Sequence, residues 1–194
     1  MTIWFSSDLH LSHSKVISHA KRPFKDIEEM NEALIKNWND SVSEKDIGYI
    51  LGDFSFAKGE ETARFIRRMN GAQIHLILGN HDAKMKDWVK KEFDSVQHYL
   101  EIKIPDETLE HGKQFVVLCH FPFLTFNKCH HGAWNLHGHC HGTLKNNKGK
   151  RLDVGVDCFD YKPVSYEQIK EIMKSKEFVA EDRHGEHNET RDEE

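Results

Sequence analysis

Residues 74–82 read IHLILGNHD, a mostly apolar run followed by glycine and three polar residues. A short apolar run that ends at glycine is typical of a buried β-strand and is too short for an ordinary helix. We therefore predict a strand over 74–78 that ends at Gly79. The polar residues that follow it, Asn80, His81 and Asp82, then lie at the carboxyl end of this strand.

The same pattern of a β-prone run followed by polar residues occurs twice upstream. Residues 2–7 lead into Asp8 and His10, and residues 47–51 lead into a glycine and Asp53. Both runs are short, apolar and bounded by polar residues, as expected of buried strands. The first part of the chain therefore contains three predicted strands, each with a carboxylate, an imidazole or an amide directly behind it.

The segments between these strands have the periodicity of helices. Apolar residues recur at helical intervals over 27–39, 59–70 and 84–92. Asp26 and Glu29 have the spacing of a capping box at the start of the first helix. After Asp8, a polar loop is predicted as far as about Phe24. Strands that alternate with helices indicate a mostly parallel sheet with crossover helices.

The second half of the chain has a different pattern. Short strands are predicted at 96–104, 115–118, 134–137 and 152–156. The first of these alternates between apolar and polar residues, and this half of the chain looks like a mostly antiparallel sheet. Ser165 and Gln168 have the spacing of a capping box and predict a final helix.

The composition is that of a globular chain. A length of 194 residues suits one domain, which we predict over 1–180. Residues 181–194 are charged without apolar periodicity and predict a disordered tail. No apolar run is long enough for a transmembrane helix, and the N-terminal residues do not have the pattern of a secretory signal.

The cysteine content indicates the cellular location, and the net charge limits the classes of binding partner. The four cysteines form no C-x-x-C pair, so we expect a reducing, cytoplasmic location. A net charge of −5 argues against broad electrostatic binding of a nucleic-acid backbone. Fifteen residues are histidine, the commonest metal ligand in proteins, and their positions decide whether that number matters.

Seven candidate metal ligands follow predicted strands: Asp8, His10, Asp53, Asn80, His120, His139 and His141. Ligands of open α/β sheets bind beyond the carboxyl ends of the strands. Seven side chains are too many for one zinc ion. They suit two ions that share a carboxylate, and nitrogen and oxygen ligands without thiolates favour manganese, iron, zinc or nickel over calcium or magnesium.

Each of these residues also has an ordinary structural interpretation. Asp8 can cap a loop, His10 can lie on the surface, and Asp53 is typical of a β-turn. His139 and His141 are harder to explain in this way, because residues i and i+2 of an extended segment point to the same side. The coincidence of five such segments favours a metal site.

Taken in order, the segments D-x-H, G-D, G-N-H-D, H and G-H-x-H resemble the motifs of the calcineurin-like metallophosphoesterase superfamily. The resemblance covers residues 2–172, and further segments look like small single-domain bacterial and phage phosphoesterases. Protein Ser/Thr phosphatases of this superfamily carry a second carboxylate and an arginine after G-D, and both are absent here. Phe56 stands where many cyclic-nucleotide and exonuclease members have an acid. A protein-phosphatase activity is therefore disfavoured.

The resemblance implies an α/β fold, a four-layer β-sandwich of two mixed sheets flanked by helices. It also implies a division of the ligands: one ion on Asp8, His10 and His141, the other on Asn80, His120 and His139, and Asp53 between them. His81 would face the substrate as a catalytic residue, with Asp82 orienting its ring. His13 and Arg22 are candidate substrate-binding residues, with solvated surface positions as their alternative.

The expected function is that of a dinuclear metal-dependent phosphohydrolase. It would cleave phosphodiesters, with monoesters as a second substrate class, by in-line attack of metal-bound hydroxide. His81 would protonate the leaving alkoxide. We expect two divalent ions, manganese first and iron, zinc or nickel as alternatives, and nucleotides or short nucleic acids as candidate substrates. The alternative is a non-catalytic scaffold on the same fold, which would typically have lost ligands that this chain retains.

Overall fold

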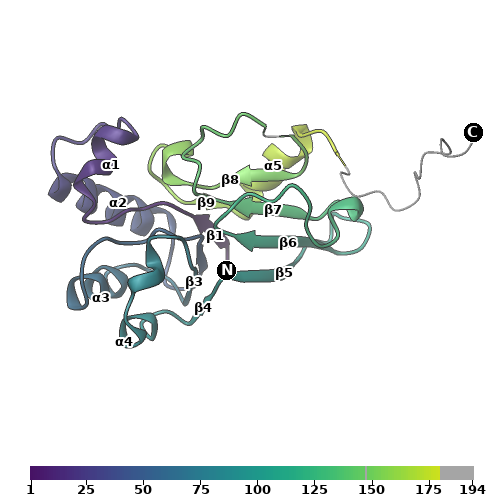
Figure 1. Ribbon diagram of the computed structural model, residues 1–194. Coiled ribbons are helices and arrows are strands. Elements are labelled where there is room, and N and C mark those ends of the chain that lie inside the picture. The colour runs from purple at the N-terminus through teal and green to yellow at the C-terminus, as the bar shows by residue number, and fades with distance from the viewer. Residues whose placement is uncertain (147, 180–194) are drawn as a thin grey trace, which may run out of the picture.

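Two β-sheets pack face to face in the computed structural model, which describes residues 1–146 and 148–179 (Figure 1). One sheet has five strands and the other four, and both contain parallel and antiparallel pairs. The expected sandwich of two mixed sheets with flanking helices is therefore confirmed. The predicted tail at 181–194 lies outside the described residues.

The first sheet has the strand order β4-β3-β2-β1-β9. Its members are β1 (Ile3–Ser6), β2 (Ile47–Ile50), β3 (Gln73–Ile77), β4 (Ser95–Gln97) and β9 (Val164–Ser165). The first four strands run parallel, and the short β9 is antiparallel to β1. The parallel sheet predicted from the first half of the chain is confirmed. Its parallel strands all end at one edge, which collects the residues that follow them.

The second sheet consists of β5 (Tyr99–Pro105), β6 (Lys113–Cys119), β7 (Trp134–His137) and β8 (Arg151–Asp153), in that order. Only β5 and β6 form an antiparallel pair, because β7 and β8 join in parallel. The prediction of a mostly antiparallel sheet is therefore wrong. In the crossovers at 120–133 and 138–150, the described residues (all but 147) form no α-helix, only the short 3-10 helix η2 (Cys129–His131), so no helical periodicity reveals these crossovers.

The helices agree with prediction where they are long. The helices that cover the outer face of the first sheet are α1 (Ser14–His19), α2 (Ile27–Ser41), α3 (Glu60–Arg67) and α4 (Asp87–Lys90). Asp26 caps α2, because its carboxylate accepts a hydrogen bond from the backbone N–H of Glu29. The short α1 falls in the predicted loop, since its one buried residue, Val16, leaves no periodicity to detect. The helix predicted at 84–92 shortens to α4, which follows the 3-10 helix η1 (Asp82–Lys84).

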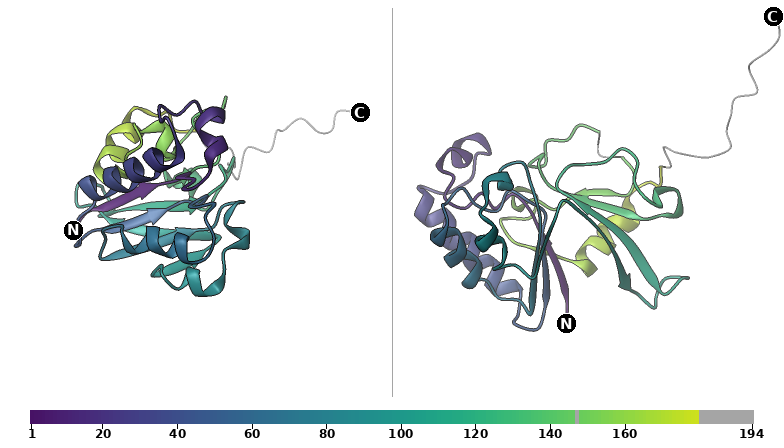
Figure 2. Two further views of the ribbon diagram at one scale, coloured as in Figure 1. Left: turned by 90° about the vertical axis from the view of Figure 1, so that its left-hand side faces the viewer. Right: turned by 60° about the horizontal axis from the view of Figure 1, so that its bottom comes forward.

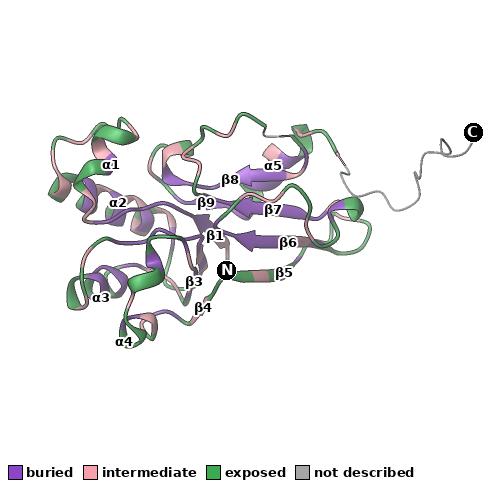
Figure 3. Cartoon of the chain, viewed as in Figure 1, coloured by how far each residue is buried: buried purple, intermediate pink, exposed green. Residues whose placement is uncertain are grey.

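Two apolar cores hold these layers together. One lies between the first sheet and the helices on its outer face, with Leu34 and Trp38 of α2 among its buried side chains. The other fills the space between the sheets and includes α5 (Tyr166–Ser175). The right-hand view of Figure 2 shows α2 and α5 on opposite sides of the first sheet, and Figure 3 shows buried strands between exposed helix surfaces and loops. Ser165 and Gln168 form the predicted capping box of α5.

No helix in residues 1–146 and 148–179 combines the length and the apolarity that crossing a bilayer requires.

Candidate metal centre

Five loops meet at one site, where the carboxyl ends of strands from the two sheets lie close together. They are the loops that follow β1, β2, β3, β6 and β7. They carry the seven predicted ligands: Asp8, His10, Asp53, Asn80, His120, His139 and His141. The loop after β1 runs beside the loop after β2, because the backbone N–H groups of Asp8 and His10 donate to the carbonyls of Gly52 and Asp53. All seven residues take part in contacts with at least one other member of the set.

Backbone conformation marks this site as unusual. The predicted ligands with left-handed backbone are Asp8, His10, Asp53, His139 and His141, with φ between 47° and 69°. Residues that have a Cβ atom rarely adopt this backbone conformation, and each such residue lowers the stability of the folded state by about 1–3 kcal/mol. The surrounding structure therefore holds these side chains in place against a local preference. Strain of this kind is concentrated at functional sites.

The first candidate ligand group consists of Asp8, His10 and His141. The Oδ1 atom of Asp8 lies 3.8 Å from Nε2 of His10 and 3.9 Å from Nε2 of His141. Both Asp8 Oδ1 and His10 Nε2 are buried and have no hydrogen-bond partner among the described residues. Burial lowers the pKa of His10, which keeps its ring neutral. Buried acceptors without donors are what a cation would satisfy, so these residues fit a metal ion.

The second candidate group consists of Asn80, His120 and His139. The Oδ1 atom of Asn80 lies 3.1 Å from Nε2 of His120 and 3.0 Å from Nδ1 of His139. The Nδ1–H of His120 donates to the carbonyl of Leu51 at 2.7 Å, so Nε2 of the neutral ring carries a lone pair. That lone pair faces the amide oxygen of Asn80. Two acceptors that face each other also fit a cation.

Asp53 lies between the two groups. Its Oδ2 atom is 3.6 Å from Nε2 of His10 and 3.5 Å from Nε2 of His120. Asp8, Asp53 and His120 form a second compact set of possible ligands. The other carboxylate oxygen of Asp53 accepts a hydrogen bond from the backbone N–H of His81 at 2.9 Å, which fixes the orientation of the carboxylate. Asp53 can therefore contact an ion in either group.

Two glycines allow these carboxylates to approach the backbone. A Cβ atom at Gly79 would lie 2.3 Å from Oδ1 of Asp53. A Cβ atom at Gly138 would lie 2.4 Å from Oδ2 of Asp8. Both distances are far inside van der Waals contact, so any other residue at either position would displace a candidate ligand.

His81 lies at the open side of the centre. Its side chain is 44% exposed, and its Nε2 atom is 3.9 Å from Oδ2 of Asp53. The ring centroid is 5.6 Å from that of His10 and 4.7 Å from that of Phe56. His81 is thus near the candidate ligands without belonging to either group, and it remains accessible to a substrate.

Asp82 does not orient His81, and this part of the prediction is corrected. The carboxylate is buried and accepts hydrogen bonds from the backbone N–H groups of Asp53, Phe54 and Gly79. These bonds join the loop after β2 to the loop after β3. Asp82 is therefore a structural residue that positions Asp53 through the backbone.

Arg22 is not a phosphate-binding residue, which corrects a second prediction. Its guanidinium is fully buried and donates to the carboxylate of Asp157 and to the carbonyls of Asp8 and Leu9. A remaining N–H points at the sulfur of Met30. All five donors are engaged, so none is left for a substrate.

Asp157 is a residue that sequence reasoning missed as part of the site. One of its oxygens is 2.6 Å from Nδ1 of His141, and Arg22 binds its carboxylate through two hydrogen bonds of 2.8 Å. The hydrogen bond to Asp157 raises the pKa of His141 and directs Nε2 of the ring toward Asp8. The sequence did contain a signal for this role, because Asp157 directly follows the predicted strand at 152–156, as the candidate ligands follow theirs.

The role of Asp157 can be measured through metal affinity. We expect Asp157→Asn to weaken binding of one ion by about 10- to 100-fold, since partners that orient a ligating histidine have effects of this size. Titration with a competing chelator gives the affinity, and thermal unfolding shows that the variant is folded. Asp160→Asn, an exposed position in the same loop, is the matched control. An unchanged affinity in Asp157→Asn would contradict this role.

His13 lies at the rim of the centre. Its ring stacks on that of Phe56 with the centroids 3.7 Å apart, and its Nδ1 atom is 3.3 Å from Nδ1 of His10. The side chain is partly exposed, so a contact with substrate remains a prediction.

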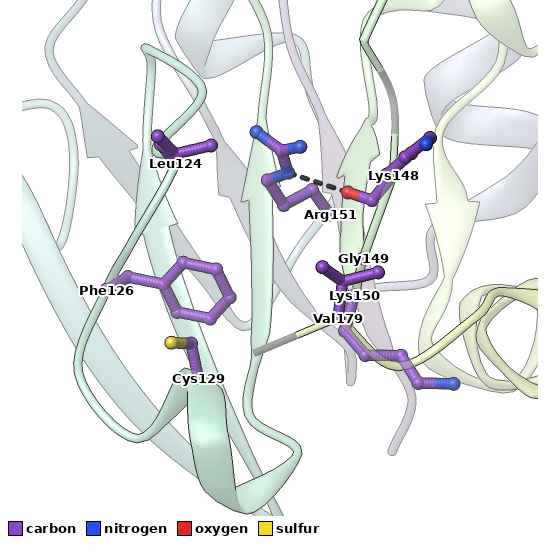
Figure 4. Close-up of a pocket in the computed structure, with 8 residues that line it drawn as sticks. All are labelled: Leu124, Phe126, Cys129, Lys148, Gly149, Lys150, Arg151 and Val179. Atoms are coloured by element: carbon purple, nitrogen blue, oxygen red, sulfur yellow. Dashed lines mark hydrogen bonds between the residues drawn. The ribbon is translucent and has the colours of Figure 1, made fainter. Parts of the chain in front are cut away.

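A crevice on the second sheet is too small to be a substrate-binding site. It lies between the segment that contains Leu124, Phe126 and Cys129 and the start of β8 (Figure 4). Its volume of about 10 Å³ has room for about one water molecule. Arg151 lies beside it and donates to the carbonyl of Lys148.

The chain is similar to known proteins both in sequence and in structure. The chain matches the family described as calcineurin-like phosphoesterase over residues 1–180. An uncharacterized protein of Methanocaldococcus jannaschii is 33% identical over 184 residues, which cover 91% of this chain and 94% of the relative. The gene 66 protein of Mycobacterium phage L5 is 28% identical, with 88% of this chain and 93% of the relative covered. The crystal structure of a protein of unknown function from Aquifex aeolicus superposes with a TM-score of 0.65 at 25% identity and covers 88% of this chain and 98% of that chain.

Proposed function

The chain belongs to the calcineurin-like phosphoesterase family, and we propose that it hydrolyses phosphodiesters with two divalent metal ions. Metal-dependent phosphoester hydrolysis is the general activity of this family, and the clusters of Asp and His can bind metal. The preference for diesters, the number of ions and the roles of individual residues are the proposal.

The observation that carries the proposal is the position of Asp53 between two groups of acceptors. Asp8 Oδ1 and His10 Nε2 lack hydrogen-bond partners in the described structure, and Asn80 faces the lone pair of His120. We assign one ion to Asp8, His10 and His141, the other to Asn80, His120 and His139, and Asp53 to both. Two such ions, when bound, lower the pKa of a shared water and neutralise phosphate oxygens.

His81 is the proposed proton donor to the leaving group. It is exposed, it lies beside Asp53, and it is the first residue after the candidate ligand Asn80. A proton delivered from its Nε2 atom to the departing oxygen would prevent the build-up of alkoxide charge. Asp53 keeps the backbone of His81 in place through the hydrogen bond from the His81 N–H.

The preference for diesters is supported by the side chains at the open side of the centre. A diester carries one negative charge at the phosphate and a second organic group, whereas a monoester carries up to two charges. Arg22 is fully engaged inside the protein and offers no clamp for a second charge. Phe56, 37% exposed, presents an apolar ring beside His81 that suits an organic group.

Manganese is the metal that we propose first, because the ligand set combines imidazole, carboxylate and amide groups without thiolates. We also propose a cytoplasmic location, which is supported by four cysteines between which the described structure forms no disulfide.

Metal removal tests the proposed function. After dialysis against a chelator, we expect hydrolysis of bis-p-nitrophenyl phosphate to fall to the uncatalysed rate. Added Mn²⁺ should restore it better than Zn²⁺ or Ni²⁺. We expect kcat/KM for this diester to exceed that for p-nitrophenyl phosphate by about tenfold or more, because each 1.4 kcal/mol of preference gives a factor of ten. Faster hydrolysis of the monoester would overturn the diester assignment, and no hydrolysis with any of the three metals would favour the scaffold alternative.

A further inference from the structure

A groove of about 690 Å³ opens beside the candidate metal centre. One wall is the loop 55–59 after β2, and the other is the segment 80–86 after β3. The helices that follow these two segments, α3 and α4, lie next to each other in Figure 1. His81 lines the groove, so the space begins where the proposed proton donor lies.

Three lysines give this groove a positive charge, and we call it the lysine groove after Lys58, Lys84 and Lys86. All three are exposed, and they form no ion pair with another residue in the described part of the chain. The only acidic residue in the lining is Asp82, whose carboxylate is buried against backbone N–H groups. The groove is therefore positive although the whole chain has a net charge of −5.

Neighbouring acidic side chains outside the lining are occupied elsewhere. Glu60 pairs with Arg67, Asp87 pairs with Lys90, and Glu61 lines a different pocket, where it accepts a hydrogen bond from Ser12. The positive charge of the lysine groove is thus available to a ligand, and a polyanion is the ligand that it would attract.

Apolar side chains share the lining with the lysines. Met85 and Val89 contribute apolar surface from the segment that leads into α4. Phe56 lies where the groove meets the metal centre, with one face of its ring stacked on His13. A partly exposed aromatic ring in a groove lined by cations is the combination that binds single-stranded nucleic acid, since bases stack on the ring and phosphates pair with the cations.

We propose that the lysine groove binds the leaving-group strand of a single-stranded oligonucleotide, an inference that rests on the proposed phosphodiesterase function. The scissile phosphate would lie at the metal centre, His81 would face the leaving oxygen, and the next phosphates would lie along the three lysines. The volume falls in the range of sites for single small ligands, about 300–1,000 Å³, so it suits one or two nucleotides of a single strand.

Binding without hydrolysis tests this inference. We would measure the affinity for fluorescent octathymidylate by anisotropy in the presence of a chelator. The triple variant Lys58→Gln, Lys84→Gln, Lys86→Gln should bind at least about tenfold more weakly. Its slope of log K against log salt should be smaller by about 1, because each of the one or two lost phosphate contacts on a single strand contributes about 0.7.

The matched control changes the same number of charges at a different groove. Lys103, Lys113 and Lys128 line a groove on the second sheet, and their triple change to Gln should leave both the affinity and the salt slope as in the wild type. Equal weakening in the two triple variants, or wild-type affinity in the lysine-groove variant, would overturn the inference.

Two further measurements separate the possible failures. Linear polyphosphate of eight units is the second probe, and binding as tight as that of octathymidylate would overturn the assignment to nucleic acid. Hydrolysis of bis-p-nitrophenyl phosphate by the wild-type protein with Mn²⁺ reports on the proposed function itself. If that hydrolysis occurs while the lysine-groove variant binds octathymidylate normally, only the groove assignment fails. If it does not occur, the proposed function fails, and the binding result still decides whether the groove takes a single strand.

Discussion

Replacing Asp53 with Asn is expected to lower kcat/KM for bis-p-nitrophenyl phosphate by about 10³-fold or more, which corresponds to about 4 kcal/mol of transition-state stabilisation. The reason is the position of Oδ2, which lies 3.6 Å from Nε2 of His10 and 3.5 Å from Nε2 of His120. Asn keeps the shape of the side chain and loses its negative charge. It therefore cannot neutralise two cations at once, and we expect the variant to bind fewer ions per chain.

Metal content and a surface control complete this experiment. Elemental analysis of the purified variants should show the loss of at least one ion per chain in Asp53→Asn. Asp40→Asn, which removes the exposed carboxylate that pairs with Lys36 on α2, should behave as the wild type in both measurements. If Asp53→Asn retained two ions and full activity, the bridging role would be wrong.

Replacing His81 with Ala is expected to act through the leaving group. Proton donation by a positioned side chain contributes about 10²- to 10⁴-fold to a reaction that needs it. We expect a loss in this range for a dinucleotide, whose leaving alkoxide is a strong base. The loss for bis-p-nitrophenyl phosphate should be about tenfold or less, because p-nitrophenolate leaves without a proton. The measurement is the ratio of kcat values for the two substrates in the variant and the wild type.

The control for this prediction is metal content, which His81→Ala should leave unchanged because the ring belongs to neither ligand group. His98→Ala removes another exposed imidazole, between β4 and β5, and should leave both substrates unaffected. An equal loss with both substrates would show that His81 acts on binding or on the metal centre, and would contradict proton donation.

Elements of the fold that depend on the local sequence were predicted correctly. A parallel strand such as β3 is recognisable because it is short, apolar and followed by glycine, and α2 is recognisable by its period and by Asp26. The pairing of β6 with β7 is not a local property. Two strands joined by an irregular crossover have the same sequence pattern whether they pair in parallel or antiparallel, so the direction was predicted wrongly.

The candidate site shows the same division between local and distant information. Positions after strands are local, and the structure brings all seven predicted ligands together at one place. The partner of a buried group is a distant property. Arg22 meets Asp157 across 135 positions of the chain, and the carboxylate of Asp82 reaches the N–H groups of Asp53 and Phe54 rather than the adjacent ring. Charge and spacing alone could not show that Arg22 and Asp82 are buried structural groups rather than groups that act on the substrate.

The left-handed backbone at Asp8, His10, Asp53, His139 and His141 has a consequence for how sequence variants of this protein would behave. Glycine adopts this conformation without steric cost, so a substitution such as His139→Gly removes local strain while it removes a candidate ligand. In the metal-free chain, selection for thermal stability alone would therefore favour changes at the positions on which the proposed activity depends. A bound metal would reverse this preference, because an ion held only by the folded state stabilises that state.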